Sequence, residues 1–291
     1  MAVSGIQYLI HPLGLPLRVV QWGLSGETVL MLHGLGSRAE TFEPVAARLA
    51  RQGYRCLALD LPGHGLSAKG DHFDYTAEGH ARLLAAVCDL IGAEPVHLVA
   101  SSLGGIHAAA FATTAPARLR SLTLIGSIGL QAMTPERRQW TADYLKDMSR
   151  EAIARRFAFA VADATIFDDA YIEESHRTNT SAGAAEAFAR IGAYYLGTIN
   201  DDVQTERLAA LGGIWPLLLL WGRGDATVTL DAAQGALARV PRSTLAIVEG
   251  ARHIPHLEQP ELVAGALATH FAEAAGTAGS FPAPLDLLRH G

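Results

Sequence analysis

The chain has 291 residues, of which 49% are hydrophobic and 18% are charged, so it is large and apolar enough to bury a substantial core. Its formal net charge of −6 at pH 7 excludes the basic footprint of a nucleic-acid-binding protein, and we expect no such partner. The two cysteines, Cys56 and Cys88, lie in apolar contexts, which favours buried thiols in a reducing compartment over a disulfide.

The N-terminal sequence and the apolar runs predict a cytoplasmic protein. Residues 1–5 contain neither the basic region nor the long apolar region of a secretion signal. The longest apolar run, residues 214–221, is far shorter than a membrane-spanning helix requires. We therefore expect no membrane partner.

The first part of the chain alternates strand-like segments with helix-like ones. Residues 6–10 and 17–22 predict an antiparallel pair of strands that is joined by a Pro/Gly connection. Further along, continuous apolar segments predict buried strands, and the segments between them have helical spacing. The predicted strands cover residues 28–32, 55–59, 96–100 and 121–125, and the predicted helices cover residues 40–52, 76–91 and 106–113. This alternation predicts an α/β fold with a doubly wound, mostly parallel sheet.

The strand predicted at residues 96–100 runs directly into two serines and two glycines. Ser102 stands where this strand turns abruptly into a helix, so its hydroxyl is presented rather than packed. Ala100 and Gly104 flank it at two residues' distance and leave the room that such a tight turn needs. The pattern is typical of a nucleophile elbow, although a plain small-residue turn between a strand and a helix is the alternative.

The pattern changes after the strand predicted at residues 121–125. Residues 131–211 contain helix formers and aromatic residues without a strong strand segment, which predicts a helical insertion. The α/β pattern resumes with strands at residues 214–221 and 243–248 and a closing helix from Pro260. From residue 276 onward, Gly, Pro and small residues predict a flexible tail.

Five motifs in this order resemble the α/β-hydrolase superfamily, in its serine-nucleophile branch. They are His-Gly-Leu-Gly at 33–36, Asp-Leu-Pro-Gly-His-Gly-Leu-Ser at 60–67, the elbow at Ser102, Trp-Gly-Arg-Gly-Asp at 221–225 and His-Ile-Pro-His-Leu-Glu-Gln-Pro at 253–260. The resemblance implies an eight-stranded sheet in a core made of residues 1–130 and 212–275. It further implies that residues 131–211 form a helical cap above the active site, and residues 276–291 remain the predicted tail.

The resemblance also implies site residues, which follow one another in the chain order of that superfamily. Ser102 is the expected nucleophile, His253 the base and Asp225 the acid that orients the histidine. The backbone amides of Leu35 and Leu103 are the expected oxyanion hole. The loop and the elbow depend on the small residues Gly34, Gly36 and Gly104.

Other polar residues in these motifs compete with that assignment. His256 lies three residues beyond His253 and is the nearest competing histidine, while Asp225 read as a turn cap is the alternative to its role as the acid. Asp60 and His64 are interpreted as structural, because the matching segment of the resembled superfamily is a shaped turn. The pair His253 and His256 lacks the Glu and the helical spacing of a zinc site, and no phosphate-binding glycine pattern is present, so we expect neither a metal nor a cofactor.

These residues predict an enzyme that hydrolyses a small, apolar carboxylic ester through an acyl-enzyme. A first alternative is a hydrolase of carbon–carbon bonds in meta-cleavage-type vinylogous diketones, although Ser101 and Ile254 stand where those enzymes carry an asparagine and an aromatic residue. A second alternative is a ligand receptor without catalysis, or a cofactor-free peroxidase-like protein, on the same scaffold. The expected partner is a small-molecule substrate, and a homo-oligomer is left open.

Overall fold

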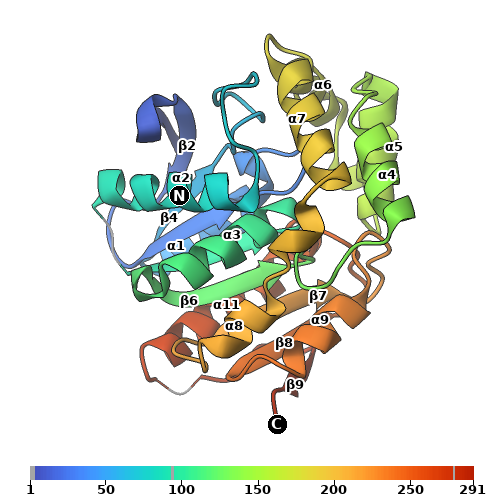
Figure 1. Cartoon of the computed structure of the whole chain (residues 1–291). Coiled ribbons are helices and arrows are strands. Elements are labelled where there is room, and N and C mark those ends of the chain that lie inside the picture. Colours follow the sequence, from blue (N-terminus) through green and yellow to red (C-terminus); the bar gives the residue numbers. More distant parts are fainter. Residues whose placement is uncertain (1–3, 93–94, 278) are drawn as a thin grey trace.

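The computed structural model describes residues 4–92, 95–277 and 279–291 (Figure 1). Residues 1–3 of the N-terminal prediction and residue 278 of the predicted tail lie outside the described residues. Within the described part, nine strands form a single sheet in the order β1-β2-β4-β3-β5-β6-β7-β8-β9. The strands are β1 (Ile6–Ile10), β2 (Leu17–Trp22), β3 (Thr28–Leu32), β4 (Arg55–Leu59), β5 (Val96–Ser101), β6 (Leu119–Ile125), β7 (Leu217–Gly222), β8 (Ser243–Val248) and β9 (Leu285–Arg289).

The predicted α/β fold with a mostly parallel sheet is confirmed. Strands β3 to β8 pair in parallel, while β1 and β2 form the predicted antiparallel pair at one edge. The expectation of eight strands is wrong by one, and residues 276–291 are not simply a loose tail. Leu285–Arg289 forms β9 and pairs antiparallel with β8, which supplies backbone hydrogen bonds that the small-residue composition of this segment does not reveal.

Helices lie on both faces of the sheet. The helices of the described residues, including those that lie apart from the sheet faces, are α1 (Glu43–Arg51), α2 (Ala77–Ile91), α3 (Leu103–Thr114), α4 (Pro135–Tyr144), α5 (Arg150–Ala160), α6 (Asp169–Asn179), α7 (Ala184–Leu196), α8 (Thr205–Ala210), α9 (Leu230–Leu237), α10 (Pro255–Glu258) and α11 (Pro260–Ala274). The N-terminus of α2 illustrates how local sequence sets these bounds, because the Thr76 hydroxyl accepts a hydrogen bond from the Gly79 amide and caps the helix.

The hydrophobic core lies in two layers, one on each face of the sheet. Alternate residues of a strand point to opposite faces, so Leu30 and Leu32 of β3 pack in the layer beneath α2 and α3. Val29 and Met31 pack in the other layer, with residues of α1 and α11. Both cysteines are buried, as the sequence predicts. Coverage on both faces explains the continuous apolar runs of the parallel strands.

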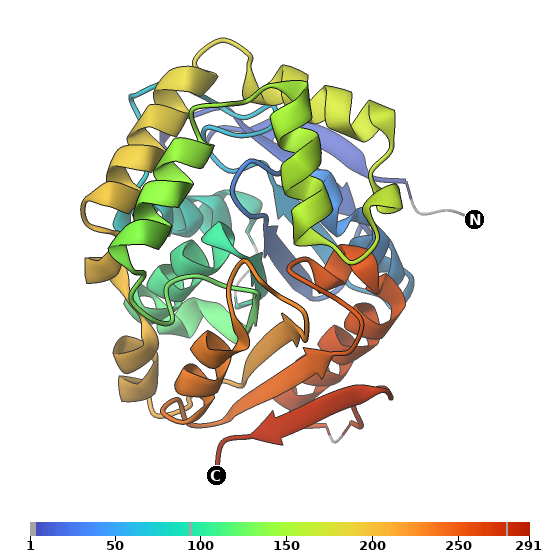
Figure 2. The ribbon, with the colours of Figure 1, turned by 90° about the vertical axis from the view of Figure 1, so that its right-hand side faces the viewer.

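The helices between β6 and β7 stand apart from the two layers. Figure 1 shows α4, α5, α6 and α7 grouped at one side of the molecule, and in Figure 2 these green-to-yellow helices surround the ends of the central strands. They occupy the segment in which the sequence predicts a helical insertion. Within the described residues, no helix combines the length and the apolar character that a membrane crossing requires.

Candidate active site

The turn at Ser102 has the strained backbone that a nucleophile elbow requires. Ser102 directly follows β5 and precedes α3, with φ 52° and ψ −117°, a conformation that costs free energy for a residue with a side chain. Three backbone hydrogen bonds hold it there: the Ser102 amide donates to Ile125 O at 2.9 Å, and its carbonyl accepts from the amides of Gly105 at 3.0 Å and Ile128 at 3.2 Å. The turn leaves Ser102 only partly buried and lining a pocket.

His253 and Asp225 reach this serine from two other strand ends. Asp225 lies beyond the end of β7 and His253 beyond the end of β8, and parallel strands bring these ends to the same edge of the sheet. His253 Nε2 lies 3.0 Å from Ser102 Oγ, and His253 Nδ1 lies 2.8 Å from Asp225 Oδ2. The structure therefore brings together the three residues that the sequence predicts as nucleophile, base and acid.

The Asp225 carboxylate is buried and fully engaged in hydrogen bonds. Its Oδ1 accepts from the amides of Thr227 at 2.8 Å and Val228 at 2.9 Å, which leaves Oδ2 for the His253 ring. Its side chain has no exposed surface. Because Asp225 Oδ2 is an acceptor beside Nδ1, the proton of a neutral imidazole lies on Nδ1. Nε2 then carries no proton and can accept one from the Ser102 hydroxyl. This is the protonation pattern that a general base needs.

Two free backbone amides flank the serine. The loop after β3 carries Leu35 into the pocket wall, and Leu103 is the first residue of α3. Neither amide donates a hydrogen bond to any residue that the structure describes. Unpaired amides at a helix start and in a glycine-rich loop favour an oxyanion.

The glycines predicted around the site allow the close approach of two chain segments. A Cβ on Gly104 would lie 2.6 Å from His33 O and 2.7 Å from Leu32 O, so α3 packs on the end of β3 only without a side chain. A Cβ on Gly34 would lie 2.9 Å from Ser102 Cβ. Gly36 turns the loop at φ +69°. Elbow and loop therefore fit against each other because glycine stands at these positions.

A pocket of about 420 Å³ opens over Ser102 and His253. This size is typical of small-molecule sites. Its wall is mostly apolar and comes from both the loops at the strand ends and the helices between β6 and β7. Apolar lining residues include Leu35, Ile128, Met133, Phe157, Phe167 and Ile254.

His256 does not take part in the contact with Ser102. Its ring is fully buried and stacks on Phe42 with a centroid distance of 4.6 Å. Burial and the nearby His253 lower its pKa to about 3, so the ring is neutral at pH 7. In the described part of the chain, no group of three or more His, Cys, Asp or Glu side chains is arranged to hold a metal ion.

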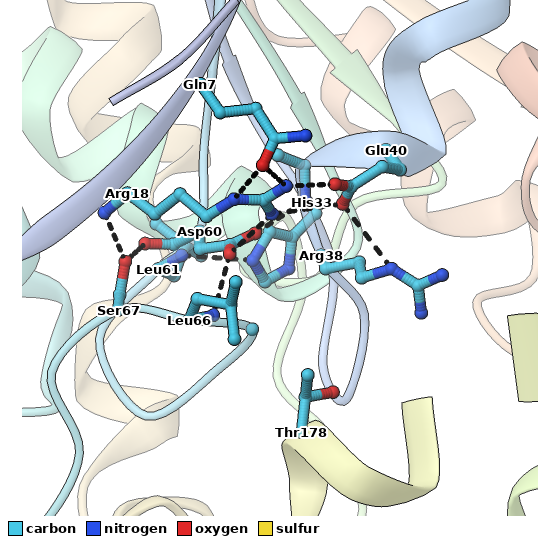
Figure 3. A network of polar contacts seen from close by, with 12 residues as sticks. Gln7, Arg18, His33, Arg38, Glu40, Asp60, Leu61, Leu66, Ser67 and Thr178 are labelled. Carbon is cyan, nitrogen blue, oxygen red and sulfur yellow. Dashed lines mark hydrogen bonds and ion pairs between the residues drawn. The ribbon is translucent and has the colours of Figure 1, made fainter. Parts of the chain in front are cut away.

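Asp60 anchors the base of the loop that carries Leu35. Its carboxylate accepts from Arg18 Nη1 at 2.9 Å and from the amides of Ala39 and Leu66, each at 2.8 Å (Figure 3). Arg18 also pairs with Glu40, and the strong hydrogen bonds of this buried network stabilise the loop geometry. Asp60 does not line the pocket, as expected for a structural residue.

Two histidines lie beneath the same loop. His33 Nε2 accepts from the Leu61 amide at 3.0 Å and its Nδ1 lies 2.7 Å from Gly34 O, which fixes a neutral tautomer with the proton on Nδ1. His64 packs edge-on against His33 with a ring-centroid distance of 5.2 Å. Burial lowers the pKa of both rings. His64 lies outside the pocket wall, in agreement with a structural role.

Sequence reasoning misses the polar residues that the helices between β6 and β7 bring to the site. Arg137 of α4 donates to Thr227 O at 2.6 Å, Asn179 of α6 donates to Gly36 O at 2.9 Å, and Ala160 O of α5 accepts from the His253 amide at 2.9 Å. These contacts join positions far apart in sequence, and no local motif marks them. The one available signal is that Arg137 is a cation within a predicted helical insertion rich in aromatic residues.

Comparisons with known proteins agree with this fold. A family model described as alpha/beta hydrolase fold matches residues 27–260. The 2-hydroxy-6-oxononadienedioate/2-hydroxy-6-oxononatrienedioate hydrolase of Cupriavidus pinatubonensis is 30% identical over 241 residues, which cover 79% of this chain and 82% of that protein. The structure of a thermophilic esterase from Thermogutta terrifontis superposes with a TM-score of 0.76 at 25% identity, covering 92% of this chain and 99% of that one.

A further relative is longer than this chain. The dihydrolipoyllysine-residue acetyltransferase component of the acetoin cleaving system of Cupriavidus necator is 28% identical over 251 residues. The match covers 84% of this chain but 64% of that protein, so this chain spans less than two thirds of its length. The similarity therefore extends over only that part of the relative.

Proposed function

Because the chain belongs to the alpha/beta hydrolase fold family, we propose that it is a serine hydrolase that cleaves a small, apolar carboxylic ester through an acyl-enzyme. The observation that carries this proposal is the continuous hydrogen-bonded series from Ser102 Oγ to His253 Nε2, at 3.0 Å, and from His253 Nδ1 to Asp225 Oδ2, at 2.8 Å. A hydroxyl, a base and an orienting carboxylate in this order are what nucleophilic catalysis by serine needs.

The proposed reaction has two halves. Ser102 Oγ attacks the ester carbonyl carbon while its proton moves to His253 Nε2, and the amides of Leu35 and Leu103 stabilise the resulting oxyanion. Collapse of this intermediate breaks the bond to the alcohol, which leaves with the proton from His253. A water molecule then attacks the acyl-enzyme, giving its proton to His253, and the acid product leaves as Ser102 regains a proton.

The character of the pocket supports an apolar ester. Apolar side chains from the loops and the helices line it, among them Phe157 and Phe167, whose rings stack with a centroid distance of 4.7 Å. Apolar walls reward the burial of a hydrocarbon chain or ring and exclude water around the reacting carbonyl. The relatives named as esterases and as carbon–carbon bond hydrolases support hydrolysis as the reaction type.

Hydrolysis of a carbon–carbon bond in a vinylogous diketone is the second candidate. It is favoured by the relative from Cupriavidus pinatubonensis, which is named as a hydrolase of such dienedioates. Ser101 and Ile254 line the pocket at the positions where the sequence departs from those enzymes. Loss of the absorbance of a coloured dienoate in the presence of the protein would favour this candidate over the ester.

The decisive experiment labels the protein with a fluorophosphonate and maps the modified residue by mass spectrometry. We expect label on Ser102, hydrolysis of short-chain p-nitrophenyl esters, and loss of both in Ser102→Ala. Ser101→Ala is the matched control, since the Ser101 hydroxyl is buried without a hydrogen-bond partner among the described residues. It should keep label and turnover. Tight ligand binding without label or turnover would instead indicate a receptor.

A further inference from the structure

We infer that Arg137 and Tyr195 form an anion-binding subsite in the pocket, and that the preferred ester carries a carboxylate at a distance from the carbonyl that reacts. This inference rests on the proposed ester hydrolysis and adds a substrate class to it. Both residues line the same pocket as Ser102 and His253, although they come from different helices, α4 and α7. The subsite is therefore open to the same bound molecule as the nucleophile.

Arg137 is a half-buried cation with unused hydrogen-bond donors. Its guanidinium packs 4.5 Å from the centroid of the Trp140 ring, and its Nη2 donates to Thr227 O at 2.6 Å. Its Nε and Nη1 donate to no residue in the described part of the chain, and no carboxylate there lies within ion-pair distance of it. Trp140 and Thr227 thus hold the guanidinium in place and leave one edge for a ligand.

Tyr195 adds a second unused donor. Tyr195 is only 3% exposed, yet it lines the pocket, and its hydroxyl has no hydrogen-bond partner among the described residues. Burial raises the pKa of this hydroxyl, while the nearby Arg137 cation acts in the opposite direction. The hydroxyl therefore keeps its proton at neutral pH and can donate it to an anion.

The other charges of the pocket do not replace this pair. Arg156 already donates to the carbonyls of Tyr144 and Asp147 and stacks 3.7 Å from the Tyr144 ring centroid. Asp143 is exposed and forms an ion pair with Lys146 at 2.6 Å. The remaining cation, Arg155, is exposed. Among the lining cations, Arg137 is thus the one that is both partly desolvated and short of partners within the described residues.

The chemistry of these donors selects a carboxylate. An arginine edge binds the two oxygens of a carboxylate in a fixed geometry, and a hydrogen bond to a charged group is stronger than one between neutral groups. A neutral ester of the same length would bury Arg137 and Tyr195 without satisfying them, which costs binding free energy. The pocket should therefore discriminate between two esters that differ in one terminal group.

The test compares matched esters. Mono-p-nitrophenyl adipate and p-nitrophenyl hexanoate share leaving group and chain length and differ in a terminal carboxylate. The pair 4-acetoxybenzoate and phenyl acetate places the carboxylate on the leaving group instead. We expect the wild type to favour the anionic ester of at least one pair in kcat/KM. In Arg137→Gln this preference should fall about 10- to 100-fold, the range for a lost hydrogen bond to a charged group.

Controls separate recognition from structural support. Arg155→Gln removes an exposed cation of the same pocket wall and should leave the preference within about twofold, as expected for a solvated charge. Tyr195→Phe removes only the hydroxyl and should lower the preference by about three- to tenfold. If Arg137 serves only to hold Thr227, Arg137→Gln will slow charged and neutral esters equally, and the inference is wrong. A wild type without preference in either pair also overturns it.

A binding measurement keeps this test independent of the ester-hydrolase proposal. If none of the four esters is hydrolysed, the proposed function fails, and calorimetric titration with adipate still examines the subsite. We expect adipate to bind the wild type at least about tenfold more tightly than Arg137→Gln. Equal binding to both proteins, or no binding to the wild type, would overturn the inference.

Discussion

Ser102 and the loops around it are held in different ways. The sheet and the segments directly joined to it hold the Ser102 elbow: its amide donates to Ile125 O in β6, and its carbonyl accepts from the Ile128 amide just beyond that strand and from the Gly105 amide of α3. By contrast, helix α6 holds the loop after β3 through Asn179, and helix α5 holds the loop that carries His253 through the carbonyl of Ala160. Helix α4 holds the loop that carries Asp225, because Arg137 donates to Thr227 O.

This difference separates two tasks. A strained backbone such as that of Ser102 persists only where the surroundings determine it fully, and hydrogen-bonded strands provide such surroundings. The loops that carry Leu35, Asp225 and His253 lie outside the sheet and each gain at least one hydrogen bond from a helix that also lines the pocket. The helices that shape the substrate pocket therefore also fix the loops of the proposed reaction, and substitutions there can alter rate as well as specificity.

The largest expected effect comes from Asp225→Asn. The Asn side-chain oxygen can still accept from the amides of Thr227 and Val228, so the loop geometry is retained while the charge beside His253 is lost. The wrong histidine tautomer is then favoured, and we expect kcat for an activated ester to fall by about 10⁴-fold. Steady-state kinetics with p-nitrophenyl acetate measures this fall, and circular dichroism checks the fold.

Asp231→Asn provides the matched control for that change. Asp231 is an exposed aspartate six residues further on, and it accepts from Gln131 Nε2 at 3.1 Å. It does not contact His253, and it accepts from the Thr229 hydroxyl at the far end of the loop that carries Asp225, so kcat should change by less than about twofold, as for other surface substitutions. If Asp225→Asn is equally harmless, Asp225 is a turn cap, as in the alternative interpretation.

The contrast between the elbow and the loops also explains which features the sequence predicts. Ser102, His253 and Asp225 all follow buried strands, and apolar strands with glycine-rich ends leave a strong local pattern. The parallel arrangement of those strands brings their ends together, so the fold and the meeting of these side chains follow from local signals. Gly104 belongs to the same class, because a tight turn requires a small residue near the serine.

The contacts made by the helices between β6 and β7 leave no such pattern. The bond from Asn179 to Gly36 O joins residues 143 positions apart, and the bond from Arg137 to Thr227 O joins residues 90 positions apart. The sequence does not reveal strand β9 for a related reason. Its pairing with β8 is a tertiary contact, which overrides the weak strand propensity of the segment. These features depend on how helices and edges pack, which a single sequence does not encode locally.

Acid should destabilise the protein through the buried histidines of the core beneath the Ser102 elbow. His80 of α2 stacks on His107 of α3 with a centroid distance of 3.6 Å, and burial lowers the pKa of His80 to about 4. Burial also lowers the pKa of His97 in β5 to about 4. Unfolded histidine has a pKa of about 6.5, so below that pH the unfolded chain binds protons that the folded protein does not.

Stability is therefore full above about pH 6.5 and is lost as the pH falls toward about 4. Below the unfolded pKa the loss from each of these two histidines approaches about 1.4 kcal/mol per pH unit, which amounts to about 1 kcal/mol each between pH 6.5 and pH 5.5. Because further buried histidines, such as His256, add to this loss, we expect the free energy of unfolding to fall by at least about 2 kcal/mol over that range. Urea denaturation at several pH values measures this slope. A flat profile over that range would contradict the prediction.

His256→Phe tests whether buried histidines cause the slope. Both ring nitrogens of His256 lack a hydrogen-bond partner among the described residues, and its ring already stacks on Phe42. Phenylalanine fills the same space without an unsatisfied polar atom and should stabilise the protein at pH 7 by about 1 kcal/mol. It also removes one titrating ring, so the fall between pH 6.5 and pH 5.5 should decrease by about 1 kcal/mol. An unchanged fall would show that His256 does not contribute and would leave the acid sensitivity to the other buried histidines, such as His80 and His97.

The smallest expected effect comes from Asn179→Ala, which removes one hydrogen bond between α6 and the loop that carries Leu35. Such a bond contributes about 1 kcal/mol, so the amide of Leu35 should lose part of its fixed position and kcat should fall by about three- to tenfold. KM should stay nearly constant, because the interaction concerns the transition state rather than the bound ester. Thr180→Ala, at the exposed end of the same helix, should have no effect on kcat. If Asn179→Ala lowers the unfolding midpoint but leaves kcat intact, the helices only cover the pocket, and the loop after β3 is held by the core as the elbow is.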